Sequence, residues 1–208
     1  DAMIAGQPRV TGIAERLDEA GTLDIALRLH PETKRVLVVH DYTVTGMATR
    51  REIETLLPRY AGRAQFEFME HLALADILAR LEKLQPGTLV LISSFANDKA
   101  GQVFDHPAVA EVFGAHCSVP IYALHGARLG HGIAGGSLLN GAEHGRRAAE
   151  LAIKVLQGAD AGSIPVETGN LSKPMFDYQV LQRFGVPLSA LPEGSGVINQ
   201  PVSLYSKH

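Results

Sequence analysis

Short apolar runs alternate along this chain with longer segments in which apolar residues recur every three or four positions. A run without polar residues is typical of a strand buried on both faces, as in a parallel sheet covered by helices. The three-to-four spacing is typical of helices with one buried face. Strands are expected at residues 35–40, 88–93 and 120–124, and helices at 47–60, 73–84, 107–115 and 141–157. This alternation predicts an α/β fold with a mostly parallel sheet and helices on both faces, in three layers.

The remaining segments are less regular. Residues 13–30 have helical spacing that Gly21 is expected to divide, with Thr22 capping the second helix. The alternating residues 65–69 suit a strand near an edge of the sheet. A short strand is expected at about 133–138, a helix at 176–184 and a loop-rich tail at 190–208.

Polar side chains follow three of the expected strands at the point where each strand ends. Parallel strands bring their carboxyl ends to one edge of a sheet, where open α/β sheets bind ligands. Arg128 suits a carboxylate, and Tyr42 or Phe95 suits a stacked ring, so a small ligand such as an amino acid or an aromatic acid is expected. The predicted ligand-binding residues are Asp41, Tyr42, Thr43 and Thr45 after the first strand, Ser93, Ser94 and Phe95 after the second, and His125 and Arg128 after the third.

Hydrolytic chemistry is the main alternative for the same residues. Ser94, His125 and Asp41 could form a Ser–His–Asp set, but the sequence has no GxSxG motif around a nucleophilic serine. Ligand binding needs only a few convergent polar groups, whereas catalysis needs a tighter geometry. The binding interpretation is therefore preferred, and no catalytic residue is assigned.

No cofactor or metal is predicted. Residues 130–135 match GxGxxG, but a dinucleotide site needs a strand directly before the glycines and a helix that opens within them, and the next helix is expected only at about residue 141. His116, His125 and His131 lie close in sequence without a matched carboxylate. Cys117 is the single cysteine, so neither an intramolecular disulfide nor a cysteine-based zinc site can form.

Charge and hydropathy narrow the range of partners. The 208 residues carry a formal net charge of −3, so no overall field draws the chain to nucleic acid or to an acidic membrane. No apolar run reaches the roughly 18 residues of a membrane-spanning helix. The expected partner is therefore a small molecule and not a nucleic acid.

Several stretches spread over nearly the whole chain form a recognisable set. They include Val10-Thr11-Gly12, Lys34-Arg35-Val36-Leu37-Val38-Val39, Pro120-Ile121-Tyr122, Gly135-Gly136-Ser137, Leu156-Gln157-Gly158, Ile164-Pro165-Val166 and Phe184-Gly185-Val186. Together they resemble the ABC-type substrate-binding proteins of the type I periplasmic-binding fold. The ending Leu191-Pro192-Glu193-Gly194-Ser195, with Tyr205, is closer to a subset in which the binding domain is the extracytoplasmic sensor of a membrane histidine kinase.

The resemblance implies the second lobe of a two-lobed binding protein, and most of the first lobe has no counterpart in this sequence. Residues 1–30 would be a leading helical segment from the first-lobe crossover, 31–137 the second-lobe α/β domain, 138–190 returning segments at the lobe interface, and 191–208 a tail leading toward a membrane segment. Half of the cleft would then be missing, and the uncovered apolar surface would suit a homodimer.

The function implied by the resemblance is a small-molecule sensor domain of a two-component histidine kinase. Such a domain is periplasmic or extracytoplasmic, and it is tethered to the membrane only through the full-length protein. It is not itself expected to be an enzyme. The alternatives are a soluble substrate-binding component of an ABC transporter, a hydrolase that uses Ser94 and His125, and a purely structural module.

Overall fold

The computed structural model of the chain describes residues 9–201, which form a seven-stranded sheet in the order β2-β1-β3-β4-β5-β6-β7. The first five strands are parallel, β6 runs antiparallel to β5, and β7 is parallel to β6. The mostly parallel sheet predicted from the sequence is therefore confirmed. The strands are β1 (Arg35–His40), β2 (Gln65–Phe68), β3 (Thr88–Ser94), β4 (Ile121–Ala123), β5 (Gly135–Leu139), β6 (Ser172–Asp177) and β7 (Gly196–Ile198).

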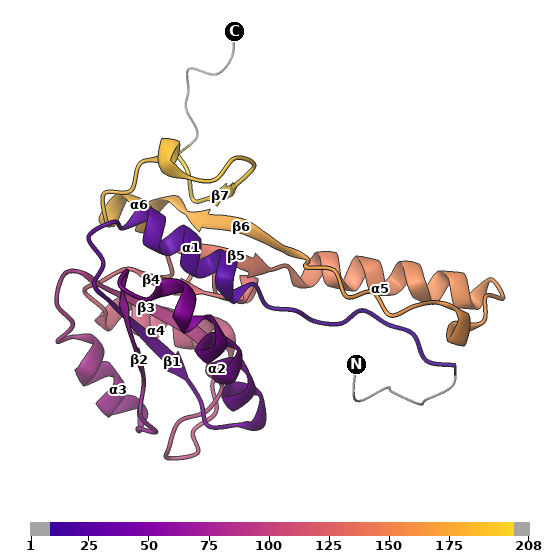
Figure 1. Ribbon diagram of the computed structural model, residues 1–208, viewed down its shortest axis with the longest axis horizontal. Coiled ribbons are helices and arrows are strands. Elements are labelled where there is room, and N and C mark those ends of the chain that lie inside the picture. Colours follow the sequence, from indigo (N-terminus) through magenta and orange to yellow (C-terminus); the bar gives the residue numbers. More distant parts are fainter. Residues whose placement is uncertain (1–8, 202–208) are drawn as a thin grey trace, which may run out of the picture.

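Helices cover both faces of this sheet (Figure 1). Leu37 and Val39 of β1 lie in one core cluster with residues of α3 and α4, whereas Val36 and Val38 lie in the other with residues of α1, α2 and α6. Successive residues of a strand point to opposite faces, so a strand between two helical layers must be apolar throughout. The helices are α1 (Glu19–Leu29), α2 (Val44–Leu56), α3 (Leu74–Leu81), α4 (His106–His116), α5 (Gly141–Leu156) and α6 (Tyr178–Arg183).

The helix expected over residues 13–30 is wrong in its first part. The chain before Asp18 is extended, and Ile13 forms an isolated parallel bridge with Glu167. Helix α1 begins at Glu19, where the Asp18 carboxylate accepts a hydrogen bond of 3.0 Å from the Gly21 N–H. A Cβ at position 21 would lie 2.3 Å from that carboxylate, so the glycine makes room for the cap and does not divide the helix.

Two other expected helices have different bounds. Helix α2 begins three residues before the expected start at 47, because the Thr43 hydroxyl caps it by accepting from the Gly46 N–H at 3.0 Å. The helix expected at 176–184 is also wrong at its start. Phe176 and Asp177 belong to β6, and α6 begins only at Tyr178, after the Asp177 cap. Strand β6 is paired on both sides, by β5 and β7, and this pairing overrides the local helical spacing.

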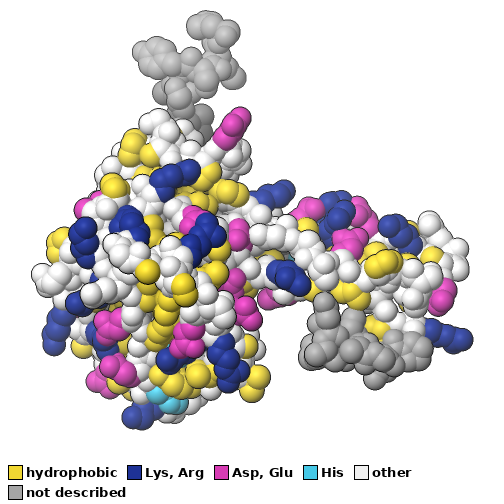
Figure 2. All heavy atoms as spheres, viewed as in Figure 1, with side chains coloured by type: hydrophobic (Ala, Val, Ile, Leu, Met, Phe, Trp, Pro, Cys, Tyr) yellow, Lys and Arg dark blue, Asp and Glu magenta, His cyan; other side chains and the backbone are white. Residues whose placement is uncertain are grey.

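Helix α5 stands out from the rest of the molecule (Figure 1). Only Leu151 of its 16 residues is buried, and Ile153 and Leu156 are 51% and 86% exposed. Acidic and basic side chains lie side by side along it in Figure 2. Arg146 forms ion pairs with Glu143 and Glu150 of the same helix. The extended segments 10–14 and 164–167 run beside this helix, and with it they are called the arm.

Candidate functional site

The carboxyl ends of β1, β3 and β4 meet at one end of the sheet, which is called the rim. It consists of the loops 41–45, 94–98 and 125–128. The Asp41 N–H donates to the Ser94 carbonyl at 2.7 Å, and the Arg128 guanidinium donates to the Phe95 carbonyl at 3.1 Å. The sheet topology therefore brings the predicted ligand-binding residues to one end of the molecule.

Asp41 holds the rim together from inside. It is 1% exposed, its Oδ1 accepts from the N–H and the hydroxyl of Thr43, and its Oδ2 accepts from the Ala96 N–H at 2.7 Å. The carboxylate thereby joins the loop after β1 to the loop after β3. A Cβ at Gly46 would lie 2.1 Å from Oδ1, so α2 approaches the carboxylate closely enough to shield it. Both oxygens of Asp41 are thus engaged within the protein.

The two aromatic rings expected to stack on a ligand contact other side chains. Tyr42 is 38% exposed, but its ring stacks on His71 at 4.4 Å, lies 5.0 Å from the His40 ring, and its hydroxyl donates to the Met69 carbonyl at 3.1 Å. Phe95 is 3% exposed and packs against the rings of Phe104 and Phe113. Phe95 therefore belongs to the core, and Tyr42 offers a ligand its edge.

The serines of β3 carry mainly structural contacts. The Ser93 hydroxyl is buried and donates to the Val39 carbonyl at 3.2 Å. Ser94 is 9% exposed, and its carbonyl receives the Asp41 N–H. Within residues 9–201 no hydrogen bond joins Ser94 to His125, so the nucleophile–base contact of a hydrolase is not formed there.

Arg128 lies entirely beneath the rim surface. It is 0% exposed, and its Nη1 and Nη2 donate to the carbonyls of His106 and Phe95 at 3.3 and 3.1 Å. Its Nε is buried without a hydrogen-bond partner, and no carboxylate in the described part of the chain forms an ion pair with it. Burial lowers the pKa of Arg128 to about 10, against the opposing attraction of the Asp41 charge.

His125 stacks on His106, the first residue of α4, with ring centroids 4.6 Å apart and an interplanar angle of 20°. The Nδ1 atom of each ring is buried without a partner. Burial, then the charges of His106 and Arg128, lower the pKa of His125 to about 4. Burial, then Arg128, also lower the pKa of His106, and Asp105 opposes them. Both rings are therefore neutral at neutral pH.

His106 was not among the predicted site residues. The sequence nevertheless carries a signal for it, since Asp105 is a helix cap and Pro107 is typical of a first helical turn. A helix that follows β3 must begin at the carboxyl end of the sheet. A histidine in its first turn is thereby placed at the rim.

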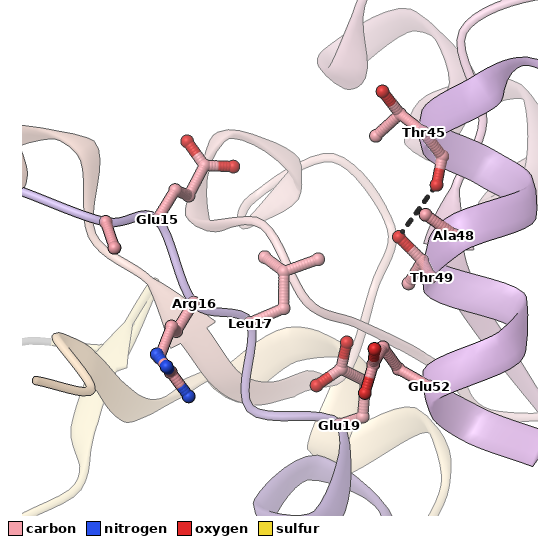
Figure 3. Close-up of a pocket in the computed structure, with 9 residues that line it drawn as sticks. Glu15, Arg16, Leu17, Glu19, Thr45, Ala48, Thr49 and Glu52 are labelled. Carbon is pink, nitrogen blue, oxygen red and sulfur yellow. Dashed lines mark hydrogen bonds between the residues drawn. The ribbon is translucent and has the colours of Figure 1, made fainter. Parts of the chain in front are cut away.

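A pocket of about 540 Å³ lies between residues 14–19 and α2 (Figure 3). Glu19 and Glu52 lie next to each other there, and Thr49 donates to the Thr45 carbonyl at 3.1 Å. Burial, then the neighbouring charges of Glu52 and Asp18, raise the pKa of Glu19. The pocket meets the rim at Thr45, which is exposed. Its lining is Ala14, Glu15, Arg16, Leu17, Glu19, Thr45, Ala48, Thr49 and Glu52.

The sequence did not indicate this pocket, because residues 13–18 were expected to be helical. As an extended segment they run in front of α2 and form one wall. Thr45 is the single predicted site residue in the lining. The other wall is α2, and its acidic lining residue, Glu52, has the ordinary spacing of an exposed helix face.

The glycine and histidine motifs do not form a nucleotide or metal site in the described residues. The glycine-rich stretch 130–135 leads into β5, and Gly132 packs closely on Gly114 of α4. His116 pairs with Glu82, away from the stacked His125. No three side chains in residues 9–201 are placed to hold a metal ion together. No helix in that range is long and apolar enough to cross a bilayer.

No protein-family model and no curated protein matches this chain. Solved structures do match it. The ligand-free, open structure of a substrate-binding protein with adhesive properties from Clostridium difficile aligns with a TM-score of 0.67 and 14% identity, over 97% of this chain and 69% of that one. An ABC domain from Streptococcus pneumoniae in complex with L-Trp aligns with a TM-score of 0.66 and 19% identity, over 91% and 63%.

A conserved domain protein from Vibrio cholerae aligns with a TM-score of 0.63 and 15% identity, over 90% of this chain and 62% of that one. This chain therefore spans about two thirds of the length of these structures. At identities of 14–19% the likeness shows a shared fold. The chain has the α/β fold of substrate-binding proteins.

Proposed function

We propose that this chain is the ligand-binding lobe of a small-molecule receptor, and that the ligand binds at the rim and in the adjoining pocket. The observation that carries the proposal is a pocket of about 540 Å³ beside the carboxyl ends of a parallel sheet. Open α/β sheets bind ligands at this end, and pockets of about 300–1,000 Å³ suit small molecules. The fold shared with substrate-binding proteins supports the same conclusion.

The lining of this pocket favours an amino acid as the ligand. Glu15, Glu19 and Glu52 line the pocket and outnumber its basic residue, Arg16, so the pocket attracts a positively charged amino group. Burial of Glu19 beside Glu52 makes this attraction stronger, since a cation relieves the repulsion between the two carboxylates. The L-Trp complex of a structural neighbour supports an amino acid as well.

The arm supports a second lobe as the partner of this one. Ile153 and Leu156 are large apolar residues that water would otherwise contact, and Val10 beside them is 40% exposed. We infer that the returning segments 138–190 pack on another lobe, and that closure of the two lobes over the ligand is the functional motion. A second copy of this chain would occupy the same face in a homodimer.

Between a sensor and a transporter component, the residues 191–195 with Tyr205 support the extracytoplasmic sensor of a histidine kinase. The sequence of the gene downstream of this chain tests that choice. A hydrophobic segment of about 20 residues followed by kinase motifs is the expected result. A stop codon directly after the domain would instead support the soluble substrate-binding component of an ABC transporter.

A thermal-shift screen of the full-length protein tests the binding function. The library contains L-tryptophan and the other amino acids, aromatic acids and sugars. A ligand present at 100 times its Kd stabilises the folded state by about 2.7 kcal/mol, so a hit raises Tm measurably. An absence of any hit across the library would contradict the proposal.

The variants Glu52→Gln and Glu54→Gln sharpen the screen. Glu52 lines the pocket, whereas Glu54 lies two residues along the same helix and pairs with Arg50. Glu52→Gln is expected to weaken binding of an amine ligand about tenfold, and Glu54→Gln is expected to leave it unchanged. Equal affinities for the two variants would show that the amino group of the ligand does not bind in this pocket.

A further inference from the structure

Arg128 is a buried cation that forms no ion pair within residues 9–201. Its hydrogen bonds go to two main-chain carbonyls, its Nε has no partner, and no carboxylate in residues 9–201 pairs with it. A buried charge is unfavourable unless opposite charge compensates it. Asp41 is the acidic group whose charge reaches Arg128, and that carboxylate is already engaged with Thr43 and Ala96. The rim therefore retains a positive potential over Arg128.

Two partly exposed imidazole rings lie near this buried charge. His106 belongs to the first turn of α4 and His125 follows β4, so the stacked pair joins the start of α4 to one loop of the rim. Arg128 donates to the carbonyl of His106 and thereby fixes the position of that residue. Asp105 is the other charged group acting on the pair, and its side chain caps α4 through the Ala108 N–H.

We propose that His106 and His125, above the buried Arg128, form an anion subsite that receives the carboxylate of the ligand. This inference rests on the proposed function and adds the negatively charged half of the ligand to it. The neutral rings can donate N–H groups to an anionic oxygen, and the Arg128 charge favours that oxygen over a neutral one. Arg128 itself acts as a positioning residue, because it is 0% exposed.

Anion binding at this pair is linked to pH. A negative charge beside an imidazole stabilises its protonated form, so the occupied site takes up protons that the empty site does not hold. The affinity for an anionic ligand is therefore expected to rise as the pH falls from about 6.5 toward 4, by about tenfold in total for each imidazole whose pKa the anion raises by about 1 unit. A neutral ligand shows no such rise.

Imidazole NMR titrations of the full chain test the subsite without a known ligand. The probe is sodium formate, compared with sodium chloride at equal ionic strength. The titration midpoints of His106 and His125 are expected to rise by about 1 pH unit in formate. His116 is the internal control for general effects of the salt, since it lies at the far end of α4. Equal midpoints for His106 and His125 in the two salts would overturn the proposal.

The variant His125→Gln removes the titrating ring and is expected to abolish the formate effect on His106. His116→Gln is the matched control and leaves that effect in place. A ligand found in the thermal-shift screen without any formate effect contradicts the anion subsite and leaves the receptor function standing. A formate effect without any ligand in the screen supports the subsite and contradicts the receptor function.

Discussion

Helices α4 and α5 both carry large apolar side chains, but most of those on α4 are buried and most of those on α5 are not. In α4 the side chains of Val109, Ala110 and Phe113 are completely buried, because this helix lies on the sheet. In α5, which is five residues longer, Leu151 alone is buried. An amphipathic pattern thus specifies that a face needs cover, and it does not specify which element supplies that cover. Within residues 9–201 the sheet covers α4, whereas Ile153 and Leu156 of the arm remain exposed.

The largest expected effect comes from the core of the body. Phe113→Ala removes a ring that packs against Phe95 in the core cluster, so it leaves a cavity. We expect the free energy of unfolding to fall by ~3–5 kcal/mol, measured by urea denaturation. The dependence of the unfolding free energy on urea concentration should stay the same. A loss below ~1 kcal/mol would mean that α4 is held no better than α5.

A smaller loss of stability is expected when the Asp41 carboxylate, which joins two loops of the rim and is called its internal brace, is removed. Asp41→Ala leaves the N–H groups of Thr43 and Ala96 without their acceptor, so the free energy of unfolding should fall by ~2–3 kcal/mol. Asp41→Asn keeps one acceptor oxygen and should lose less. The neighbouring Thr45→Ala is the surface control and should change stability by less than ~0.5 kcal/mol. If Asp41→Ala were as mild as this control, the brace would have no energetic role.

The pH dependence of stability reports on the rim and not on the arm. The pKa of His125 is about 4 in the folded protein and about 6.5 in the unfolded chain, so the unfolded state binds the extra proton between these values. Stability is fully present above about pH 6.5 and falls as the pH falls toward 4. Thermal unfolding measured across this range should show a shallower decline in His125→Gln than in the wild type. An unchanged slope would contradict the buried, neutral state of His125.

The smallest effect is expected in the arm. Leu156 is 86% exposed, so Leu156→Ser should change the free energy of unfolding of this chain by less than ~0.5 kcal/mol. The same substitution should weaken any assembly that covers the arm, measured by analytical ultracentrifugation or by the stability of the full-length protein. A loss of several kcal/mol in the isolated chain would show that the arm already has a partner within it.

The body of the fold was predictable from sequence for a local reason. Strands β1 and β3 are buried on both faces, so their apolar runs are unambiguous, and the expected strand at 35–40 agrees with β1. Residues 13–18 and 176–177 were misassigned, because their conformation depends on pairing with distant strands and segments. Helical spacing in such short stretches is a weak signal beside a hydrogen-bonded partner.

The placement of the rim was predictable to a similar degree. The topology rule for parallel sheets places Asp41, Ser94 and His125 at one end of the molecule. The rule does not say whether a side chain faces inward or outward. Asp41, Phe95 and Arg128 proved to be engaged within the protein, and the pocket lined by Glu19 and Glu52 was missed. Asp41 and Arg128 remain candidates to shape a ligand site from within the protein, whereas the exposed Thr45 is a candidate to contact the ligand.

The parallel sheet, its buried central strands and the end at which polar residues gather could be inferred from the sequence, because hydrophobic periodicity and strand polarity are local properties. Three further features appear only in the folded chain. They are the stacking of His125 on His106, the hydrogen bonds of the buried Arg128 to two main-chain carbonyls, and the exposure of Ile153 and Leu156 on α5. Each of these depends on which distant segments lie together in space, and no spacing of residues along the chain encodes that directly.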